Sequence, residues 1–253
     1  MGNRMNGQTA NQFAGFKPES FRFFYDLARN NNKPWFDEHR DVYETHVTGA
    51  FRGLLAALEP ALLDLNPHFE ISGKTNANFT RINRDIRFSK DKSPYKSNYY
   101  LRVFDTRRSH QSDGWLYVGL SADALTVGFA NYASWRRGEK STLQTVFPTR
   151  FRTHRAVFDG LLERVVRKGR FETYWHRQEK GEWAQHPGLP RRDDDWLTLQ
   201  AWIVRKVFTP ESRALASPAF ARKVEEIFRQ LFPLYVFTSQ PGTTWQRALR
   251  ASL

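Results

Sequence analysis

The sequence predicts an α+β fold: an N-terminal αα-hairpin, a central, mostly antiparallel sheet, and C-terminal helices packed on that sheet. The prediction rests on where the apolar residues fall. They recur at helical spacing before residue 60, alternate as in strands over about residues 78–133, and return to helical spacing after residue 150. A run of strands between two helical regions is typical of the α+β class rather than of alternating βαβ units.

The N-terminal elements are predicted to be helices. Residues 16–30 carry apolar side chains at intervals of three and four, and Pro18 suits the first turn. A second helix is expected from Pro34 to about residue 49, and a third continues to about Pro60. The short asparagine run between the first two helices predicts an αα-hairpin.

The middle of the chain is predicted to form the sheet. Residues 79–88 and 99–104 are two candidate strands, and residues 115–120 and 125–130 indicate a hairpin. The two hairpin strands are almost free of charged residues, so we expect them at the centre of the sheet.

The last part of the chain is predicted to be mainly helical. We expect helices over residues 154–168 and 196–208, and another helix that begins at Pro218. Residues 178–195 are expected to be a loop. The three aspartates at its end, Asp193 to Asp195, suit a helix N-terminus better than a cation site.

The composition indicates one ordered domain. Its 253 residues are 40% hydrophobic and include 21 Phe, 9 Tyr and 8 Trp, which excludes a disordered chain. We expect a single domain at residues 15–240, a flexible arm at 1–14 and a tail at 241–253. The absence of cysteine excludes disulfides and thiolate metal sites. Without a signal peptide or an apolar span, a cytoplasmic protein with no membrane partner is expected.

The charge is strongly basic, with a net value of +13. Basic residues are concentrated in residues 78–110 and 136–180, on either side of a nearly uncharged centre. Such an imbalance fits an anionic small molecule or a nucleic acid as partner. It is equally what a generally basic protein would show, because net charge says little about one site.

The most informative segment is RINRDIRFSKDKSPYK at residues 81–96. If residues 79–88 form a strand, Arg84 lies on the apolar row, where an unpaired charge is costly. Asp85 then lies on the opposite face, where it can pair with Arg81 or Arg87. We therefore expect an anion-binding cradle with Trp35 as a pocket wall; its members are Arg84, Arg87, Ser89, Lys90, Lys92, Tyr95 and Lys96.

A purely structural interpretation of the same residues stays open. The arginines and aspartates of this run could form ion pairs that hold the fold together, and Trp35 could pack at a corner between helices. If the cradle belongs to an enzyme, Asp85 and Asp91 are the candidate general acid and base. The sequence leaves open whether any reaction is catalysed.

Other chemistries find little support. The chain has no GxSxG elbow, no GxGxxG and no phosphate-binding P-loop, so it names no cofactor. His39 and His46 share a helix face, but no acid completes a metal-ligand set, and we expect no metal site. Phe88, Tyr95, Tyr99 and Tyr100 lie among basic residues and could stack on the bases of a single strand.

The run RDIRFSKDKSPYK at residues 84–96 resembles the hallmark RDxRFSKDKxPYK of the family catalogued as domain of unknown function twenty-four sixty-one. NNNKPWFDEHRDVYE at residues 30–44 is similar to a second conserved stretch of that family. The resemblance covers most of residues 16–235 and implies a single mixed α/β domain. It implies no activity, cofactor or catalytic residue. The segment GEWAQHPGLPRRDDDWLTLQAW at 181–202 departs from the family pattern.

Three functions follow as hypotheses. The first is an intracellular protein, enzyme or not, whose basic Arg, Lys and Tyr pocket takes a phosphate- or carboxylate-bearing ligand. The second is a module that binds nucleic acid without sequence specificity through the same surface. The third is a structural or interaction protein in which the Arg–Asp run only stabilises the fold.

Overall fold

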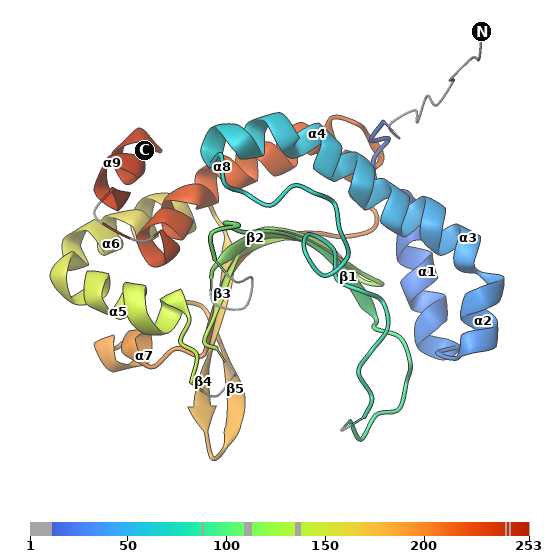
Figure 1. The fold of residues 1–253 in the computed structure, drawn as a ribbon, viewed down its shortest axis with the longest axis horizontal. Coiled ribbons are helices and arrows are strands. Elements are labelled where there is room, and N and C mark those ends of the chain that lie inside the picture. Colours follow the sequence, from blue (N-terminus) through green and yellow to red (C-terminus); the bar gives the residue numbers. More distant parts are fainter. Residues whose placement is uncertain are drawn as a thin grey trace, which may run out of the picture.

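A six-stranded antiparallel sheet bends into an arch, with helices along its convex side and at both ends (Figure 1). This architecture is seen in a computed structural model that describes residues 12–87, 89–108, 113–134, 138–240, 242 and 244–252. The strand order is β1-β2-β3-β6-β4-β5. The strands are β1 (Asn98–Val103), β2 (Trp115–Ser121), β3 (Leu125–Tyr132), β4 (Glu172–Glu179), β5 (Glu182–Pro187) and β6 (Ala201–Phe208).

The N-terminal helices form one end of the arch, and the last of them runs along its convex side (Figure 1). They are α1 (Pro18–Arg29), α2 (Lys33–Glu38), α3 (Arg40–Val42), the π-helical segment η1 (Tyr43–Gly49) and α4 (Ala50–Leu65). The predicted αα-hairpin is confirmed. Asn32 caps α2 by accepting a hydrogen bond from the Trp35 backbone at 3.0 Å, as a helix start requires.

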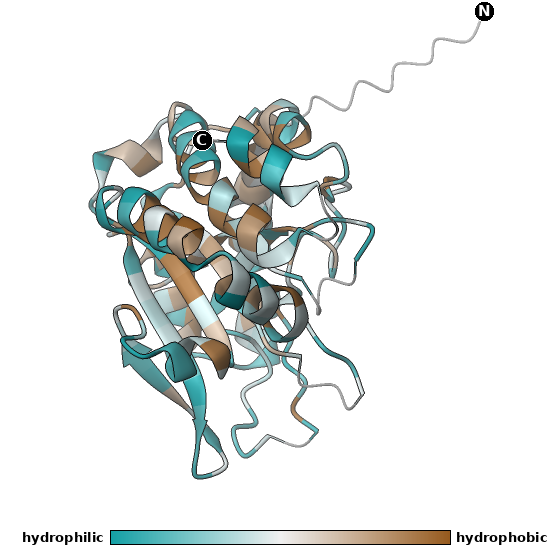
Figure 2. Cartoon of the chain, turned by 90° about the vertical axis from the view of Figure 1, so that its left-hand side faces the viewer, coloured by the Kyte–Doolittle hydropathy of each residue, from teal (hydrophilic) through white to brown (hydrophobic). Residues whose placement is uncertain are grey.

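The C-terminal helices cover the convex side of the sheet and the other end of the arch. They are α5 (Thr142–Thr153), α6 (Arg155–Leu161), η2 (Leu162–Arg167), α7 (Asp193–Leu197), η3 (Arg213–Ala216), α8 (Phe220–Ser239) and α9 (Trp245–Ala251). Helix α8 packs on β2 and β3 and runs beside α4 (Figure 1). Hydrophobic and hydrophilic residues alternate along the helices (Figure 2), as expected when one face is buried.

The predicted α+β class is therefore confirmed, with helices, then an antiparallel sheet, then helices packed on it. The hairpin of β2 and β3 is confirmed, and its uncharged strands occupy an interior position. The helix predicted over residues 154–168 is confirmed as α6 and η2. The sheet is wider than predicted, because β4, β5 and β6 all lie beyond residue 133.

Two predictions for residues 178–208 are wrong. The expected loop at 178–195 is largely the β4–β5 hairpin, whose turn residues Lys180 and Gly181 both have positive φ, at 49° and 89°. A turn of this kind is usually marked by Asn-Gly or Asp-Gly, so Lys-Gly is a weak signal. The expected helix at 196–208 ends after α7, and the β-branched run that follows forms β6.

The predicted strand at 79–88 is also wrong. The described residues of this segment form isolated bridges and no strand; the bridges join Phe79 to Thr75 and Leu101, and Asn83 to Tyr95. Asp85 instead accepts hydrogen bonds from the backbone and guanidinium of Arg87, a local turn that competes with strand pairing. Phe88 lies outside the described residues. The segment nevertheless lies along β1, because the Thr80 amide donates to the Tyr100 carbonyl at 3.1 Å.

The two ends of the chain also contribute to the fold. Phe13 is buried, although it belongs to the predicted arm at 1–14; residues 1–11 lie outside the described residues. The predicted tail at 241–253 includes α9, whose Trp245 is buried edge-on against Phe237 with 5.5 Å between ring centroids. Helix α8 itself begins at Phe220, two residues after the predicted Pro218.

A buried carboxyl group links the start of β2 to α8. Asp113 is fully buried and accepts a hydrogen bond from the Tyr235 hydroxyl at 3.0 Å, and its other oxygen has no partner. Burial raises the pKa of Asp113 to about 7, although the nearby Arg108 acts in the opposite direction. A carboxyl group whose pKa rises on folding favours the folded state most when it is protonated.

Asp113→Asn should therefore stabilise the protein at pH 8 but not at pH 4. The folded pKa lies above the unfolded value, so the wild type loses stability as the pH rises from about 4 to 7. Each unit of that rise in pKa is worth about 1.4 kcal/mol, and asparagine removes the charge while it keeps an acceptor for Tyr235. Urea unfolding at both pH values measures the difference; an equal effect at pH 4 and pH 8 contradicts it.

Candidate functional site

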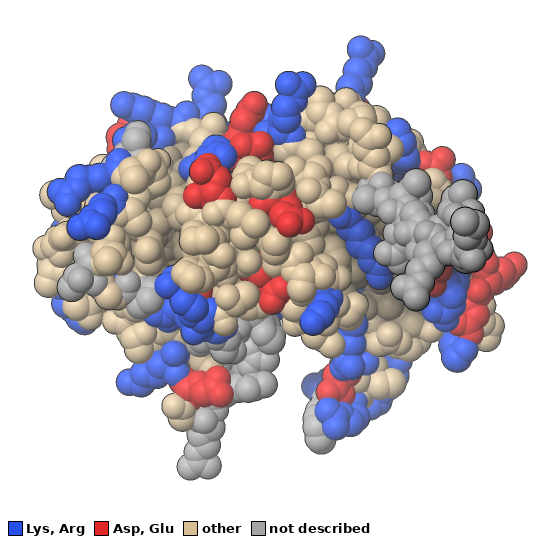
Figure 3. All heavy atoms as spheres, turned by 45° about the horizontal axis from the view of Figure 1, so that its top comes forward, with Lys and Arg blue, Asp and Glu red and all other residues tan. Residues whose placement is uncertain are grey.

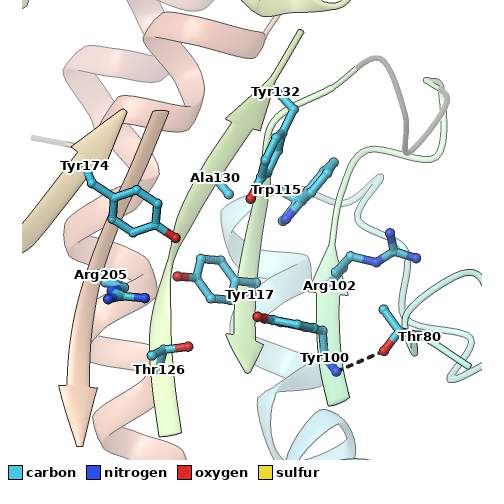
Figure 4. Close-up of a pocket in the computed structure, with 10 residues that line it drawn as sticks. All are labelled: Thr80, Tyr100, Arg102, Trp115, Tyr117, Thr126, Ala130, Tyr132, Tyr174 and Arg205. Carbon is cyan, nitrogen blue, oxygen red and sulfur yellow. Dashed lines mark hydrogen bonds between the residues drawn. The ribbon is translucent and has the colours of Figure 1, made fainter. Parts of the chain in front are cut away.

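The concave face of the sheet holds a pocket of about 220 Å³ (Figure 4). It lies on the side of the sheet where the 84–96 loop and the β4–β5 hairpin project (Figure 1). Its walls are mostly aromatic and its polar groups are hydroxyls and guanidinium groups. The lining residues are Thr80, Tyr100, Arg102, Trp115, Tyr117, Thr126, Ala130, Tyr132, Tyr174 and Arg205.

The alternation of side chains along the strands places these residues on one face. In β2, Leu116, Val118 and Leu120 enter the main core, so Trp115 and Tyr117 must face the concave side. The same alternation in the neighbouring strands brings the other tyrosines to this face. Tyr117, Ala130, Ala201 and Ile203 form a small second cluster beneath them.

Two glycines make room for the tyrosine rings. Gly119 is paired with Tyr100 across β1 and β2, and Gly128 is paired with Tyr117 across β2 and β3. A Cβ atom on Gly119 would lie 2.3 Å from Cε1 of Tyr100, and one on Gly128 would lie 2.8 Å from the same atom of Tyr117. The sequence pattern favours close packing for these glycines over phosphate binding, and they do pack closely.

Gly119→Ala should lower the stability of the protein by about 1–3 kcal/mol, because the new methyl group forces the Tyr100 ring out of place. Gly160→Ala is the matched control, since a Cβ at Gly160 meets nothing within 4 Å and alanine favours the helix. Thermal denaturation compares the two. A melting temperature for Gly119→Ala as high as that of the control contradicts the packing described.

The hydroxyls of the four pocket tyrosines are protonated hydrogen-bond donors. Burial raises the pKa of Tyr100, Tyr117, Tyr132 and Tyr174, so all four stay protonated at neutral pH. In the described part of the chain, none of their hydroxyls has a hydrogen-bond partner within the protein. The hydroxyls of Tyr117 and Tyr174 are turned toward each other (Figure 4).

The two arginines of the pocket differ in their partners. Arg205 donates to Glu172 at 2.6 and 3.2 Å, and its guanidinium carbon lies 4.9 Å from the centre of the Tyr174 ring. Arg102 has no acid partner among the residues that the structure describes. Its Nε is buried without a hydrogen bond, burial lowers its pKa, and its guanidinium lies 5.8 Å from the centre of the Trp115 ring.

The predicted cradle residues mostly bind one another instead of surrounding an open site. Arg84 forms an ion pair with Asp91, and Arg87 forms one with Asp85 at 2.7 Å. Lys92 donates to the Ile86 carbonyl at 3.0 Å. Ser89 lies 3.5 Å from Arg84, and Lys90 is exposed. Lys96 is half-buried and the positive charge of Arg102 lowers its pKa, but it does not line the pocket.

Tyr95 and Trp35 belong to the contact between this loop and the N-terminal helices. The Asn31 side chain makes two hydrogen bonds of 3.0 Å to the backbone of Tyr95, one as donor and one as acceptor. The Tyr95 ring stacks on Phe36 at 4.2 Å. Trp35 stacks on His39 at 4.1 Å, and it does not line the pocket. This contact joins the two runs that carry the family resemblance.

The two candidate catalytic carboxylates are held in the ionised form. The hydrogen bonds from Arg87 lower the pKa of Asp85 to about 2. Those from Ser93, together with Arg84, hold the pKa of Asp91 well below its usual range. Carboxylates of such low pKa are weak bases at neutral pH, which disfavours an acid–base role for the pair.

The sequence interpretation missed most of the pocket. Sequence reasoning does not single out Tyr117, Tyr132, Tyr174, Arg205 or Arg102 as site residues. One signal for the first two was present: aromatic residues alternate with the core row of each central strand, where a sheet exposed on one side would carry polar residues. Tyr174 and Arg205 had no such signal, because their segments were not identified as strands.

The search for other kinds of site gave no candidate. In the ranges that the structure describes, no three His, Asp or Glu side chains lie close enough together to hold a metal ion. Within those same ranges, no helix combines the length and the apolar character needed to cross a bilayer. Comparison with curated proteins finds no match.

One family model does match, and its description is "conserved hypothetical protein" (DUF2461). The match spans residues 19–237 and so contains the whole sheet, the pocket and the 84–96 loop. It agrees with the resemblance of the two runs that meet at Asn31 and Tyr95. The chain belongs to the conserved hypothetical protein family DUF2461.

Proposed function

We propose that this protein binds a small anionic molecule in the pocket on the concave face of the sheet. The observation that carries the proposal is Arg102, a partly buried arginine without an acid partner in the described ranges and with a buried, unsatisfied Nε. Burying a charge without a partner costs stability, so such a residue is expected where a ligand supplies the missing charge.

The other pocket residues suit the rest of such a ligand. Four protonated tyrosines offer hydroxyl donors, and their rings with Trp115 offer flat apolar walls. A pocket with aromatic walls and a few placed polar groups is the usual form of a small-molecule site. The ligand expected here carries a phosphate or carboxylate group at the Arg102 end and a flat or apolar body along the tyrosines.

The pocket favours binding over acid–base catalysis. Its lining residues are threonine, tyrosine, arginine, tryptophan and alanine, so the lining contains no carboxylate and no histidine. General acid–base catalysis at neutral pH needs a group with a pKa near 7, and the burial of the tyrosines moves their pKa values further from it.

The test is a thermal-shift panel at low and high salt. It contains inorganic phosphate, sugar phosphates, nucleotides, dicarboxylates, aromatic phosphates and a short single-stranded oligonucleotide. We expect one small anion to raise the melting temperature at both salt concentrations, because a ligand that binds only the folded state stabilises it. If only the oligonucleotide does so, and only at low salt, nucleic-acid binding replaces this proposal.

Of the residues predicted from sequence, Lys96 enters the proposal through its position beside Arg102. A ligand-binding role for Arg84, Arg87, Ser89, Lys90 and Lys92 stays a prediction. The same panel tests it with Arg84→Met: an undiminished shift in this variant indicates that the Arg84–Asp91 pair is structural.

A further inference from the structure

Three chain segments that each carry a cationic residue lie side by side near the Arg102 end of the pocket. The Arg102 amide donates to the Asn78 carbonyl at 2.7 Å, and the Lys96 amide donates to the Ile82 carbonyl at 2.8 Å. Arg81 lies between Ile82 and Thr80, and Thr80 lines the pocket. These backbone hydrogen bonds hold the segments that carry Arg81, Lys96 and Arg102 side by side, and the charges of Arg81 and Arg102 both act on Lys96.

The three positive charges repel one another. Burial lowers the pKa of Lys96, and the positive charges of Arg81 and Arg102 lower it further. In the part of the chain that is described, no carboxylate forms an ion pair with any of the three. The positive charge of Arg81 contributes to the lowered pKa of Asp85, but Asp85 accepts its hydrogen bonds from Arg87.

We propose that Arg81, Lys96 and Arg102 together bind the phosphoryl group of a phosphate monoester; this rests on the function proposed above. When a monoanion binds to three cations, a net charge of +2 remains at the site. When a dianion binds, a net charge of only +1 remains, so the dianion compensates the cations better. A phosphate monoester is mostly dianionic at pH 7.5, since its second pKa is about 6. Carboxylates, sulfate esters and the phosphodiesters of nucleic acids each carry one charge per group.

The test compares phenyl phosphate with phenyl sulfate by isothermal titration calorimetry at pH 7.5. The two ligands share a ring and a tetrahedral anion, and they differ by one charge. We expect phenyl phosphate to bind at least about 10-fold more tightly, with most of that preference lost in Lys96→Met. Arg81→Met should lose part of the preference for phenyl phosphate. Because the Arg81 side chain is exposed, this variant is expected to fold, and it tests the proposal even if Lys96→Met misfolds.

The control variant is Arg22→Met, whose side chain is 81% exposed on α1 and pairs with Asp26. It should leave both affinities unchanged. Equal affinities for the two ligands, or tighter binding of phenyl sulfate, overturn the phosphoryl assignment and leave the pocket in place. If no small anion binds and only an oligothymidylate does, the pocket itself is overturned as well.

Discussion

Replacing Arg102 with methionine should weaken the binding of phenyl phosphate by about 10- to 100-fold and should not destabilise the free protein. A hydrogen bond to a charged group contributes about 1.5–3 kcal/mol, which corresponds to that range of affinity. The Arg102 guanidinium is partly desolvated and its Nε has no hydrogen bond in the free protein. Methionine at this position therefore removes the free-energy cost of burying an unpaired charge. Calorimetric titration and thermal denaturation measure the two effects.

The two readouts separate a binding role from a structural one. If the arginine were structural, its replacement would lower the stability of the protein. If the arginine is retained for ligand binding, its replacement lowers only the affinity for the ligand. Arg22→Met again serves as the surface control. A variant that binds phenyl phosphate as tightly as the wild type contradicts the role assigned to Arg102, and so does a variant that fails to fold.

Arg150→Met should show the opposite behaviour, with a loss of about 3 kcal/mol in stability, or roughly 6–12 °C in melting temperature. Arg150 is buried and donates to the carbonyls of Val236 and Phe237 at 2.9 and 2.8 Å, and to that of Gln240. It therefore adds hydrogen bonds to the last carbonyls of α8, where a cation is also favoured. Thermal and urea unfolding measure the loss.

Arg152→Met is the matched control for Arg150, because Arg152 lies on the same helix and is exposed. Its replacement should change stability by less than about 0.5 kcal/mol. Equal melting temperatures for the two variants contradict the capping role of Arg150. Burial lowers the pKa of Arg150 to about 10, so the residue stays charged and the effect should persist across neutral pH.

Arg102 and Arg150 show why burial alone does not identify a functional residue. Both guanidinium groups are partly desolvated, and neither has an acid partner among the described residues. Only Arg150 donates hydrogen bonds to backbone carbonyls that take the place of water. The sequence contains no sign of this difference, because it depends on where α8 ends relative to α5 and on how β1 faces the pocket. The structure therefore identifies Arg150 as a cap of α8 and Arg102 as a candidate binding residue.

The sequence predicts the fold wherever side-chain spacing is unambiguous. The N-terminal helices and the β2–β3 hairpin follow from apolar periodicity alone. The errors fall at 178–208, where a Lys-Gly turn lacks the usual hairpin signal and the acidic first turn of the short helix α7 resembles the start of a longer helix. The sheet pairing of β6 with β3 and β4 overrides local helix propensity there.

The candidate site was harder to predict than the fold. The basic run at 84–96 attracts attention, yet its side chains pair locally through Asp85 and Asp91. The pocket is assembled from five strands and one loop, so its residues are spread from Thr80 to Arg205. Only the sheet topology shows that β1 and β6 belong to one concave surface.

The charged surface over α4 and α8 does not form a broad basic face of the kind that binds nucleic acid. On the face formed by α4 and α8, Lys and Arg side chains are scattered and interspersed with Asp and Glu (Figure 3). Ion pairs such as Arg229–Asp64 neutralise part of that face. A steep salt dependence of binding would require many unneutralised cations acting together.

The most direct test of this account is an amide NMR titration of the uniformly labelled protein with phenyl phosphate. The largest chemical-shift changes should fall on β1 and β2 around Tyr100, Arg102 and Tyr117, and on Lys96 beside them. Changes confined to the 84–93 loop, or spread evenly over the surface, would contradict the assignment of the concave pocket as the binding site.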